Sequence, residues 1–141
     1  MRDALIRLFR PSRVAYAHCD LPCGVYDPAQ ARIEAESVRA IQQKYQDPEN
    51  QKSAHETAEE FKARCIEIKE ERADLVKHHL WVLWTDYFKP NHLEQHPGLH
   101  ETFWKATKAA GESKRSTDPQ QGQDLLDQIK EIDRIFWETK K

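Results

Sequence analysis

Apolar residues recur at helical spacing in four stretches of the chain, separated by polar or turn-forming segments. In the first stretch, Asp27-Pro28 is typical of a helix start, with Asp as the N-cap and Pro at the first helical position. The apolar positions then continue to about Gln46, at Ile33, Val38, Ile41 and Tyr45. Residues 47–50 (DPEN) interrupt the pattern, so we predict that the first helix ends there.

The second stretch is the longest. Ser53 opens it, and Glu56 three residues later is placed to complete a capping box. The pattern then recurs every three or four residues at Phe61, Cys65, Ile68, Arg72, Leu75, His79, Leu83 and Tyr87. A straight helix of about 36 residues would measure ~54 Å, which is long for a small bundle. We therefore expect a kink or a break in the crowded region 78–84.

Two further helices follow a loop marked by Pro90 and Pro97-Gly98. The third helix is predicted from Leu99, Phe103, Ala106 and Ala110, and the fourth from Leu125, Ile129, Ile132 and Phe136. Residues 111–117 are polar and turn-like, and Asp118-Pro119 repeats the helix-start signal. No segment alternates as a strand would. The sequence therefore predicts an all-α fold, an up-and-down four-helix bundle in one domain.

Composition and charge narrow the class of protein. The 141 residues are 33% charged and have a mean hydropathy of -0.90, and no apolar run approaches the roughly 18 residues of a membrane span. The net charge of -2 argues against nucleic acid as the main partner. We predict a protein of the cytoplasm with neither a nucleic-acid nor a membrane partner.

Candidate chemistry is concentrated in residues 18–26 (HCDLPCGVY), which we call the hook. Its Pro and Gly exclude a regular helix, and one imidazole and two thiolates within six residues suggest a soft transition metal. The two cysteines could instead form a disulfide, half of a structural zinc site or a thiol redox pair. A chain with three cysteines is not a disulfide scaffold, no second ligand pair at finger spacing follows, and redox pairs normally have two intervening residues.

The run from His18 to Val38, HCDLPCGVYDPAQARIEAESV, resembles the start of mature nickel-containing superoxide dismutase, in which this segment holds the metal. The resemblance continues in five blocks: KEER at 69–72, KHHL at 77–80, DYFKP at 86–90, STDP at 116–119 and IFWETKK at 135–141. It fades between Tyr45 and Phe61, where residues 47–54 look like an extended connection. The resemblance implies an oxidoreductase that converts superoxide to dioxygen and hydrogen peroxide.

The resemblance implies that His18, Cys19 and Cys23 are the metal ligands and that the cofactor is nickel. The residues account for this if the chain is cut after Ala17, because the new α-amine and the Cys19 amide nitrogen can then close a chelate ring. The Cys19 thiolate, the Cys23 thiolate and the His18 imidazole complete a nitrogen and sulfur set suited to Ni(II) or Cu(II). An uncut chain offers only an amide at His18, so cleavage is part of making the site.

Residues 1–17 differ from the rest of the chain. They contain four arginines and one aspartate, a charge of +3, so their removal would change the net charge from -2 to -5. Following the resemblance, we interpret them as a propeptide that a dedicated peptidase removes. Ala15-Tyr16-Ala17 also resembles an export cleavage site, but Arg7 divides the apolar stretch that an export signal needs.

The resemblance assigns roles to residues around the metal. Glu34 is similar to the carboxylate that orients the His18 ring, with Arg72 as its partner, and Tyr26 resembles the tyrosine that lines the approach to nickel. Pro22 is similar to a family proline that follows a cis peptide bond, and Lys89 adds positive potential for an anionic substrate. Glu34 and Arg72 would otherwise pass as solvated helix residues.

Other chemistry-bearing residues have a structural interpretation. We interpret Cys65, in an apolar stripe, as a buried hydrophobe, and the adjacent His78 and His79 as packing residues that cannot readily clamp one metal. Four aromatic residues exceed what one face of a helix buries and predict a subunit interface: Trp81, Trp84, Tyr87 and Phe88. The resemblance implies a homohexamer.

We therefore predict a nickel superoxide dismutase made as a precursor. The alternatives are a nickel- or copper-binding helical protein without turnover, and a helical interaction module in which the cysteines are incidental.

Overall fold

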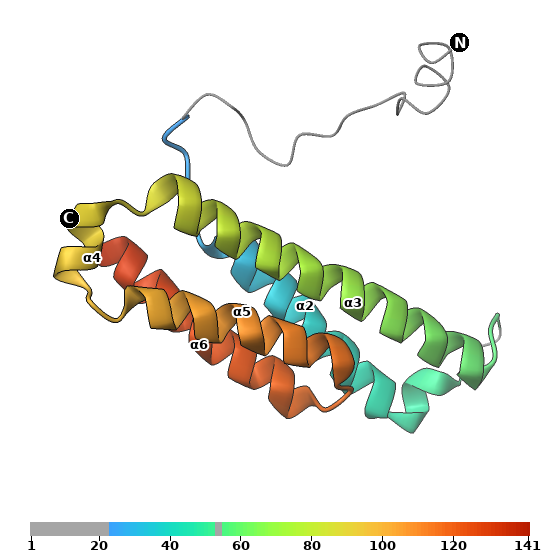
Figure 1. Cartoon of the computed structure of the whole chain (residues 1–141). Helices are drawn as coiled ribbons and strands as arrows, with labels where there is room; N and C mark the ends of the chain where they lie inside the picture. The colour runs from blue at the N-terminus through green and yellow to red at the C-terminus, as the bar shows by residue number, and fades with distance from the viewer. Residues whose placement is uncertain (1–22, 53–54) are drawn as a thin grey trace, which may run out of the picture.

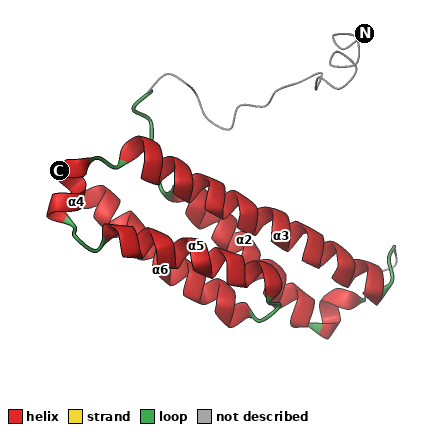
Figure 2. Ribbon diagram, viewed as in Figure 1, coloured by secondary structure: helices red, strands yellow, loops and turns green. Residues whose placement is uncertain are grey.

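Four long helices run up and down in a computed structural model that describes residues 23–52 and 55–141 (Figure 1). The helices are α2 (Ala29–Gln46), α3 (Ala58–Val82), α5 (Leu99–Arg115) and α6 (Pro119–Glu138). Two shorter elements of one turn each, η1 (Pro48–Gln51) and η2 (Leu83–Tyr87), and the six-residue helix α4 (Pro90–Gln95) lie in the connections. The described residues contain helices and loops but no strand (Figure 2), which confirms the predicted fold class.

The long helices form a ring in which α2 and α5 each pack against α3 and α6. Each helix buries one stripe, and the stripe of α6 is the predicted one: Leu125, Ile129, Ile132 and Phe136. Two predicted core positions are wrong, because Ile33 and Ile68 are exposed. On α2, Ala31, Ala35 and Val38 face the core instead. Small side chains let α2 lie close to its neighbours.

Local capping chemistry sets most of the helix starts. Asp27 Oδ1 accepts a hydrogen bond from Ala29 N at 2.8 Å, and Asp118 Oδ1 accepts one from Gln120 N at 2.9 Å. Pro28 itself occupies the N-cap position of α2, one residue from the prediction. These two contacts satisfy backbone N–H groups that have no partner inside the helix.

The predicted start of the second helix is wrong. Ser53 lies outside the described residues, and α3 begins at Ala58. The capping box is formed by Thr57 and Glu60, whose side chains accept each other's backbone N–H at 3.2 and 2.7 Å. The sequence contains two Ser/Thr-x-x-Glu motifs in succession, and the helix uses the second one.

The predicted break in the long helix is confirmed. Regular α-helix ends at Val82, and η2 continues the chain as a π-helical turn that Phe88 N closes onto Leu83 O at 3.1 Å. Such turns are rare and often lie at functional sites. This turn places the end of α3 beside the start of α2.

The predicted turn over residues 111–117 is wrong over 111–115, because α5 continues through Gly111 to Arg115. Two buried side chains hold the end of this helix. The Lys69 ammonium donates to the carbonyls of Ser113, Lys114 and Ser116, and Gln42 Nε2 donates to Ser116 O at 3.1 Å. These tertiary contacts outweigh the low helix propensity of glycine.

One end of the bundle gathers four chain segments that are distant in sequence. The start of α2, the end of α3 with η2, the start of α5 and the end of α6 all lie there (Figure 1). No helix in the described ranges has the length and apolar character needed to cross a membrane. The hook residues that the structure describes lie at this end.

Candidate metal centre

The structure describes the last four residues of the hook, whereas His18, Cys19 and Pro22 lie outside the described residues. Cys23 is exposed and forms no disulfide, and its Sγ lies 3.8 Å from Val25 O. Gly24 has φ of 73°, in the left-handed region that favours glycine. Beyond Gly24, Tyr26 packs onto the bundle, whereas the Cys23 side chain stays exposed.

Tyr26 packs against the end of the bundle. Its ring centroid lies 5.7 Å from that of Tyr87 in η2, and the ring contacts the main core cluster. Together with Val25, His79 and Leu83, Tyr26 lines a small cavity of about 110 Å³. Tyr26 therefore links the hook to α3 and η2.

A second cavity, of about 400 Å³, opens on the other side of Tyr26. Its lining comes from the hook, η2, α4 and the C-terminal tail: Gly24, Tyr26, Asp86, Tyr87, Lys89, His92 and Lys140. Lys89 Nζ donates to Asp86 O at 3.2 Å, and Lys140 Nζ lies 4.9 Å from the centroid of the Tyr87 ring. The lining contains two lysine ammonium groups and one aspartate carboxylate, which sum to a charge of +1 in a chain of net negative charge.

Glu34 and Arg72 are brought together across two helices. Arg72 Nη1 on α3 donates to Glu34 Oε2 on α2 at 3.2 Å and lies 3.4 Å from Oε1. The Glu34 side chain is 16% exposed and that of Arg72 is 36% exposed. An ion pair with this much shielding from water holds the carboxylate in a defined orientation more firmly than a surface pair does.

His79, a position in the stripe predicted for the second helix, lies at this end of the bundle. It is half-buried beside Tyr26, and its ring lies 5.4 Å from that of His78 at an interplanar angle of 71°. Burial, with a smaller contribution from the His78 charge, lowers the pKa of His79, and Glu34 opposes the shift.

Within residues 23–52 and 55–141, no three His, Cys, Asp or Glu side chains converge as a metal site would require. A metal centre at this end therefore needs donors from the rest of the hook. Cys23 is consistent with that requirement, because its side chain is exposed and forms no disulfide. Together with the imidazole and thiol that the sequence places at positions 18 and 19, it gives a mixed nitrogen and sulfur set.

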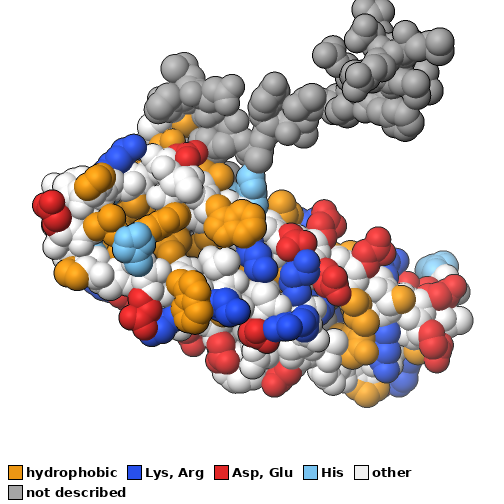
Figure 3. Space-filling view, in the orientation of Figure 1, with side chains coloured by type: hydrophobic (Ala, Val, Ile, Leu, Met, Phe, Trp, Pro, Cys, Tyr) orange, Lys and Arg blue, Asp and Glu red, His pale blue; other side chains and the backbone are white. Residues whose placement is uncertain are grey.

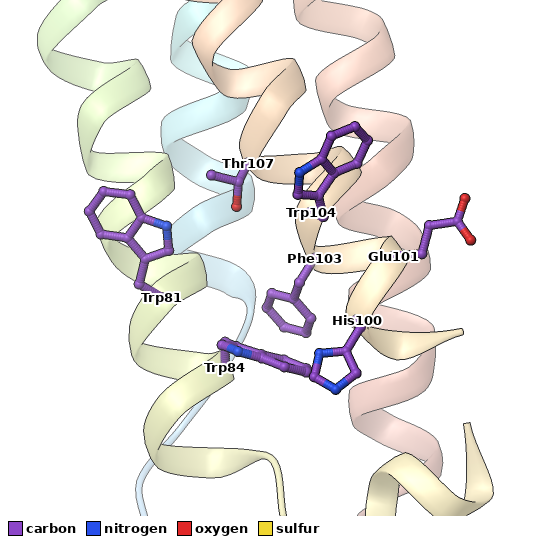
Figure 4. A pocket seen from close by; sticks show the side chains of 7 residues that line it. All are labelled: Trp81, Trp84, His100, Glu101, Phe103, Trp104 and Thr107. Carbon is purple, nitrogen blue, oxygen red and sulfur yellow. The ribbon is translucent and has the colours of Figure 1, made fainter. Parts of the chain in front are cut away.

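The predicted aromatic interface needs correction. Phe88 is 7% exposed, and Trp84 and Tyr87 pack against the chain's own core. Trp81 alone of the four is largely exposed, at 53%, and Trp104 on α5 is exposed at 62%. Residues of α3, η2 and α5 line the hollow of about 500 Å³ on this face: Trp81, Trp84, His100, Glu101, Phe103, Trp104 and Thr107 (Figure 4).

The space-filling view shows hydrophobic side chains gathered on the same face near the hook end (Figure 3). Cys65, by contrast, is buried in α3, and burial raises the pKa of its thiol. This agrees with the prediction that it acts as a small hydrophobe.

The sequence did not indicate the parts of the site that come from Tyr87 and the C-terminal tail. Tyr87 Oη lies 2.7 Å from Thr139 Oγ1, and Lys140 lies over the ring of Tyr87. The only sequence signal is that both segments fall in blocks that resemble the family, 86–90 and 135–141. Contact between them depends on the arrangement of the helix ends.

Comparison with known proteins gives a consistent result. A family model described as nickel-containing superoxide dismutase matches residues 13–140. The protein "Superoxide dismutase [Ni]" of Streptomyces seoulensis is 58% identical over 137 residues, which are 97% of this chain and 98% of that protein. The protein of the same name from Streptomyces coelicolor is 55% identical over the same shares of both chains.

Solved structures agree with the sequence comparison. A crystal structure of a nickel-containing superoxide dismutase in the oxidised state has a TM-score of 0.79 and 58% identity, over 87% of this chain and 98% of that chain. A native nickel superoxide dismutase structure has a TM-score of 0.76 and 55% identity over the same shares.

Proposed function

The chain belongs to the family of nickel-containing superoxide dismutases, and from that premise we propose that it converts superoxide to dioxygen and hydrogen peroxide. Two superoxide ions and two protons give one molecule of each product. The observation that carries the proposal is the family match over residues 13–140. The exposed, unbridged Cys23 at the end of the bundle is consistent with it.

Nickel bound at the hook supplies the one-electron acceptor and donor that the reaction needs. The residues that would hold it are His18, through its α-amine and imidazole, Cys19, through its amide nitrogen and thiolate, and Cys23, through its thiolate. Thiolates and a deprotonated amide donate electrons strongly and stabilise the higher oxidation state of the metal.

Removal of residues 1–17 by a maturation peptidase is part of the proposal, because a peptide-bonded His18 has no α-amine to offer. The coverage of the comparisons supports this step. The full-length relatives match 97% of this chain, whereas the solved chains, themselves matched over 98% of their length, match 87% of it. A leader absent from the solved proteins would produce this difference.

The described residues around the hook then orient ligands and guide the substrate. The Glu34 carboxylate, held by Arg72, is the acceptor that would fix the His18 imidazole. Lys89 and Lys140 attract an anion to the cavity, whose lining includes the hook residue Tyr26. We propose that the Tyr26 hydroxyl holds water or superoxide near the metal.

We also propose that the protein assembles into a homo-oligomer, the hexamer that the family resemblance implies, and that it works in the cytoplasm. Trp81 and Trp104 are exposed beside a hollow on the same face. In a symmetric dimer contact, an exposed tryptophan of one copy could fill the hollow of the other. Reduced cytoplasmic conditions preserve the two thiols that the site needs. Sedimentation analysis of wild type and Trp104→Gln tests the oligomer, since a smaller species is expected for the variant.

The function is tested by cysteine variants in protein that has been trimmed to begin at His18 and loaded with nickel. Cys19→Ser and Cys23→Ser should abolish rapid superoxide loss and stoichiometric nickel, as measured by stopped-flow kinetics and metal analysis. Cys65→Ala, which changes the cysteine of α3, is the matched control and should retain both. Wild-type protein that binds nickel without removing superoxide would instead support the metal-carrier alternative.

A further inference from the structure

We propose that the C-terminal end of α6 positions Tyr26, the last residue of the hook, with Thr139 as the positioning residue. Thr139 fixes Tyr87, and Tyr26 packs against Tyr87. The consequence for catalysis rests on the proposed function, whereas the hydrogen bond between Thr139 and Tyr87 is independent of it.

The direction of the hydrogen bond follows from counting protons. Thr139 Oγ1 donates its single hydroxyl proton to Phe136 O at 2.7 Å. The 2.7 Å contact between Tyr87 Oη and Thr139 Oγ1 must therefore be donated by the tyrosine. The phenolic proton of Tyr87 is directed into a relay that ends at a backbone carbonyl of α6.

Three aromatic rings and one ammonium group surround the Tyr87 ring. Its centroid lies 4.4 Å from that of Phe136, 5.0 Å from that of Phe88 and 5.6 Å from that of His92. The Lys140 ammonium lies 4.9 Å from the ring centroid and 5.2 Å from that of Phe136. Ring packing fixes the plane of the Tyr87 ring, and the hydrogen bond to Thr139 fixes the position of its hydroxyl group.

Tyr26 is the hook residue that packs against the fixed Tyr87 ring. Its centroid lies 5.7 Å from that of Tyr87 at an interplanar angle of 52°, and both rings line the 400 Å³ cavity that also contains Lys89 and Lys140. A shift of Tyr87 would move the surface on which Tyr26 rests. The tail of α6 therefore acts on the hook through one intermediate residue.

This arrangement separates the roles of two tyrosines in one cavity. Tyr87 has its proton committed to Thr139, so it acts as a fixed wall and not as a proton source for peroxide. Removal of either hydroxyl of the pair should have the same consequence, because each removal breaks the same bond.

The test uses Thr139→Val, Tyr87→Phe, the double variant and Thr139→Ser. Thr139→Ser keeps the hydroxyl, so it should retain both the hydrogen bond to Tyr87 and the wild-type activity. Thr102→Val is the matched control, because Thr102 Oγ1 donates to Gly98 O at 3.1 Å in the same way but lies on α5. The first readout is ultraviolet resonance Raman spectroscopy of the full chain, in which the tyrosine doublet distinguishes hydrogen-bond donors from acceptors. Subtracting the Tyr87→Phe spectrum isolates the Tyr87 signal.

We expect a donor signature for Tyr87 in wild type, Thr139→Ser and Thr102→Val, and its loss in Thr139→Val. The second readout is kcat/KM of trimmed, nickel-loaded protein, which should fall by roughly tenfold in Thr139→Val through misplacement of the site. Tyr87→Phe and the double variant should show the same fall, which is the non-additivity expected of residues that share one interaction.

Three outcomes would overturn the inference: an unchanged donor signature in Thr139→Val, an unchanged rate in an active protein, or a Tyr87→Phe defect clearly larger than that of Thr139→Val. The last result would mean that Tyr87 acts directly on the reaction. Trimmed wild type without activity would instead refute the proposed function, and the Raman signature would still report on the bond.

Discussion

Arg72 Nη1 on α3 donates to Glu34 Oε2 on α2 at 3.2 Å, so the two helices next to the hook are joined by a partly shielded ion pair. The pair lies close enough to His79 for the Glu34 charge to act on that imidazole. The described residues therefore already fix the orientation of the Glu34 carboxylate at this end of the bundle.

The first prediction concerns Glu34→Gln, which removes the carboxylate charge and keeps the shape. Trimmed protein carrying this change should lose roughly tenfold or more in nickel affinity or in superoxide removal, because the imidazole loses its charged outer acceptor. Glu36→Gln is the control, since Glu36 pairs with Arg32 at 2.8 Å on the exposed face of the same helix. Equal behaviour of the two variants would contradict the assigned role of Glu34.

The second prediction contrasts two glycines. A Cβ at Gly122 would lie 2.8 Å from Arg39 Cα and would collide with Gln42 Oε1, so Gly122→Ala should destabilise the fold by about 1–3 kcal/mol. At Gly111 a Cβ would meet the flexible end of Lys77 at 3.3 Å, so Gly111→Ala should stabilise the fold by about 0.5–1 kcal/mol. Urea unfolding of both variants measures the free energy of unfolding, which should fall in Gly122→Ala and rise in Gly111→Ala.

The third prediction concerns Lys69, whose side chain is buried against the last carbonyls of α5. Lys69→Met should lower the free energy of unfolding by about 2 kcal/mol, because buried carbonyl acceptors lose their donor. Lys105→Met removes an exposed partner of Glu101 and should cost about 0.5 kcal/mol or less. If the two variants unfold at the same urea concentration, Lys69 does not cap the helix.

The fourth prediction is that the protein loses stability as the pH falls below about 6.5, the ordinary pKa of histidine. Burial lowers the native pKa of His79 and His92. Below pH 6.5 the unfolded chain therefore binds protons that the native state does not, and the free energy of unfolding falls until the native pKa is passed.

Unfolding curves at pH 7.5 and 5.5 check this dependence. His79→Gln should reduce the loss of stability between the two pH values, and His92 should account for part of what remains. His55→Gln, at an exposed position before α3, is the matched control and should keep the wild-type loss. A His79→Gln variant with the full wild-type loss would contradict the prediction.

Much of the fold could be predicted because its signals are local. Asp118 is the N-cap of α6 as expected, and Asp27 accepts a hydrogen bond from the start of α2 although Pro28 is the N-cap residue there. The excess length of the second apolar stripe indicated a break that η2 provides. The errors arose where local signals compete. Ser53 and Thr57 begin equivalent motifs, and Gly111 was interpreted as part of a turn although contacts from Lys69 and Gln42 keep that segment helical.

In the candidate site, too, the residues within one local motif could be predicted and those joined only by tertiary packing could not. The ligands of the hook were predicted from one continuous motif, and the structure brings Glu34 and Arg72 together, while their role toward His18 stays a prediction. Tyr87, Thr139 and Lys140 could not be placed from the sequence, because 52 residues separate Tyr87 from Thr139 and only the packing of helix ends joins them. The short helix α4 was missed because its six residues are too few to show a period.

The up-and-down path returns the chain's last residues to the end of the bundle where Tyr26 packs, so the C-terminus is a poor place for an affinity tag or a fluorophore, as is the amine that trimming would expose at His18. An extension after Lys141 would crowd Thr139 and Lys140, and an extension before His18 would cover the amine. The connection at Pro48–Gln51, at the opposite end of α2, is the better attachment point for purification handles, surface immobilisation or single-molecule probes.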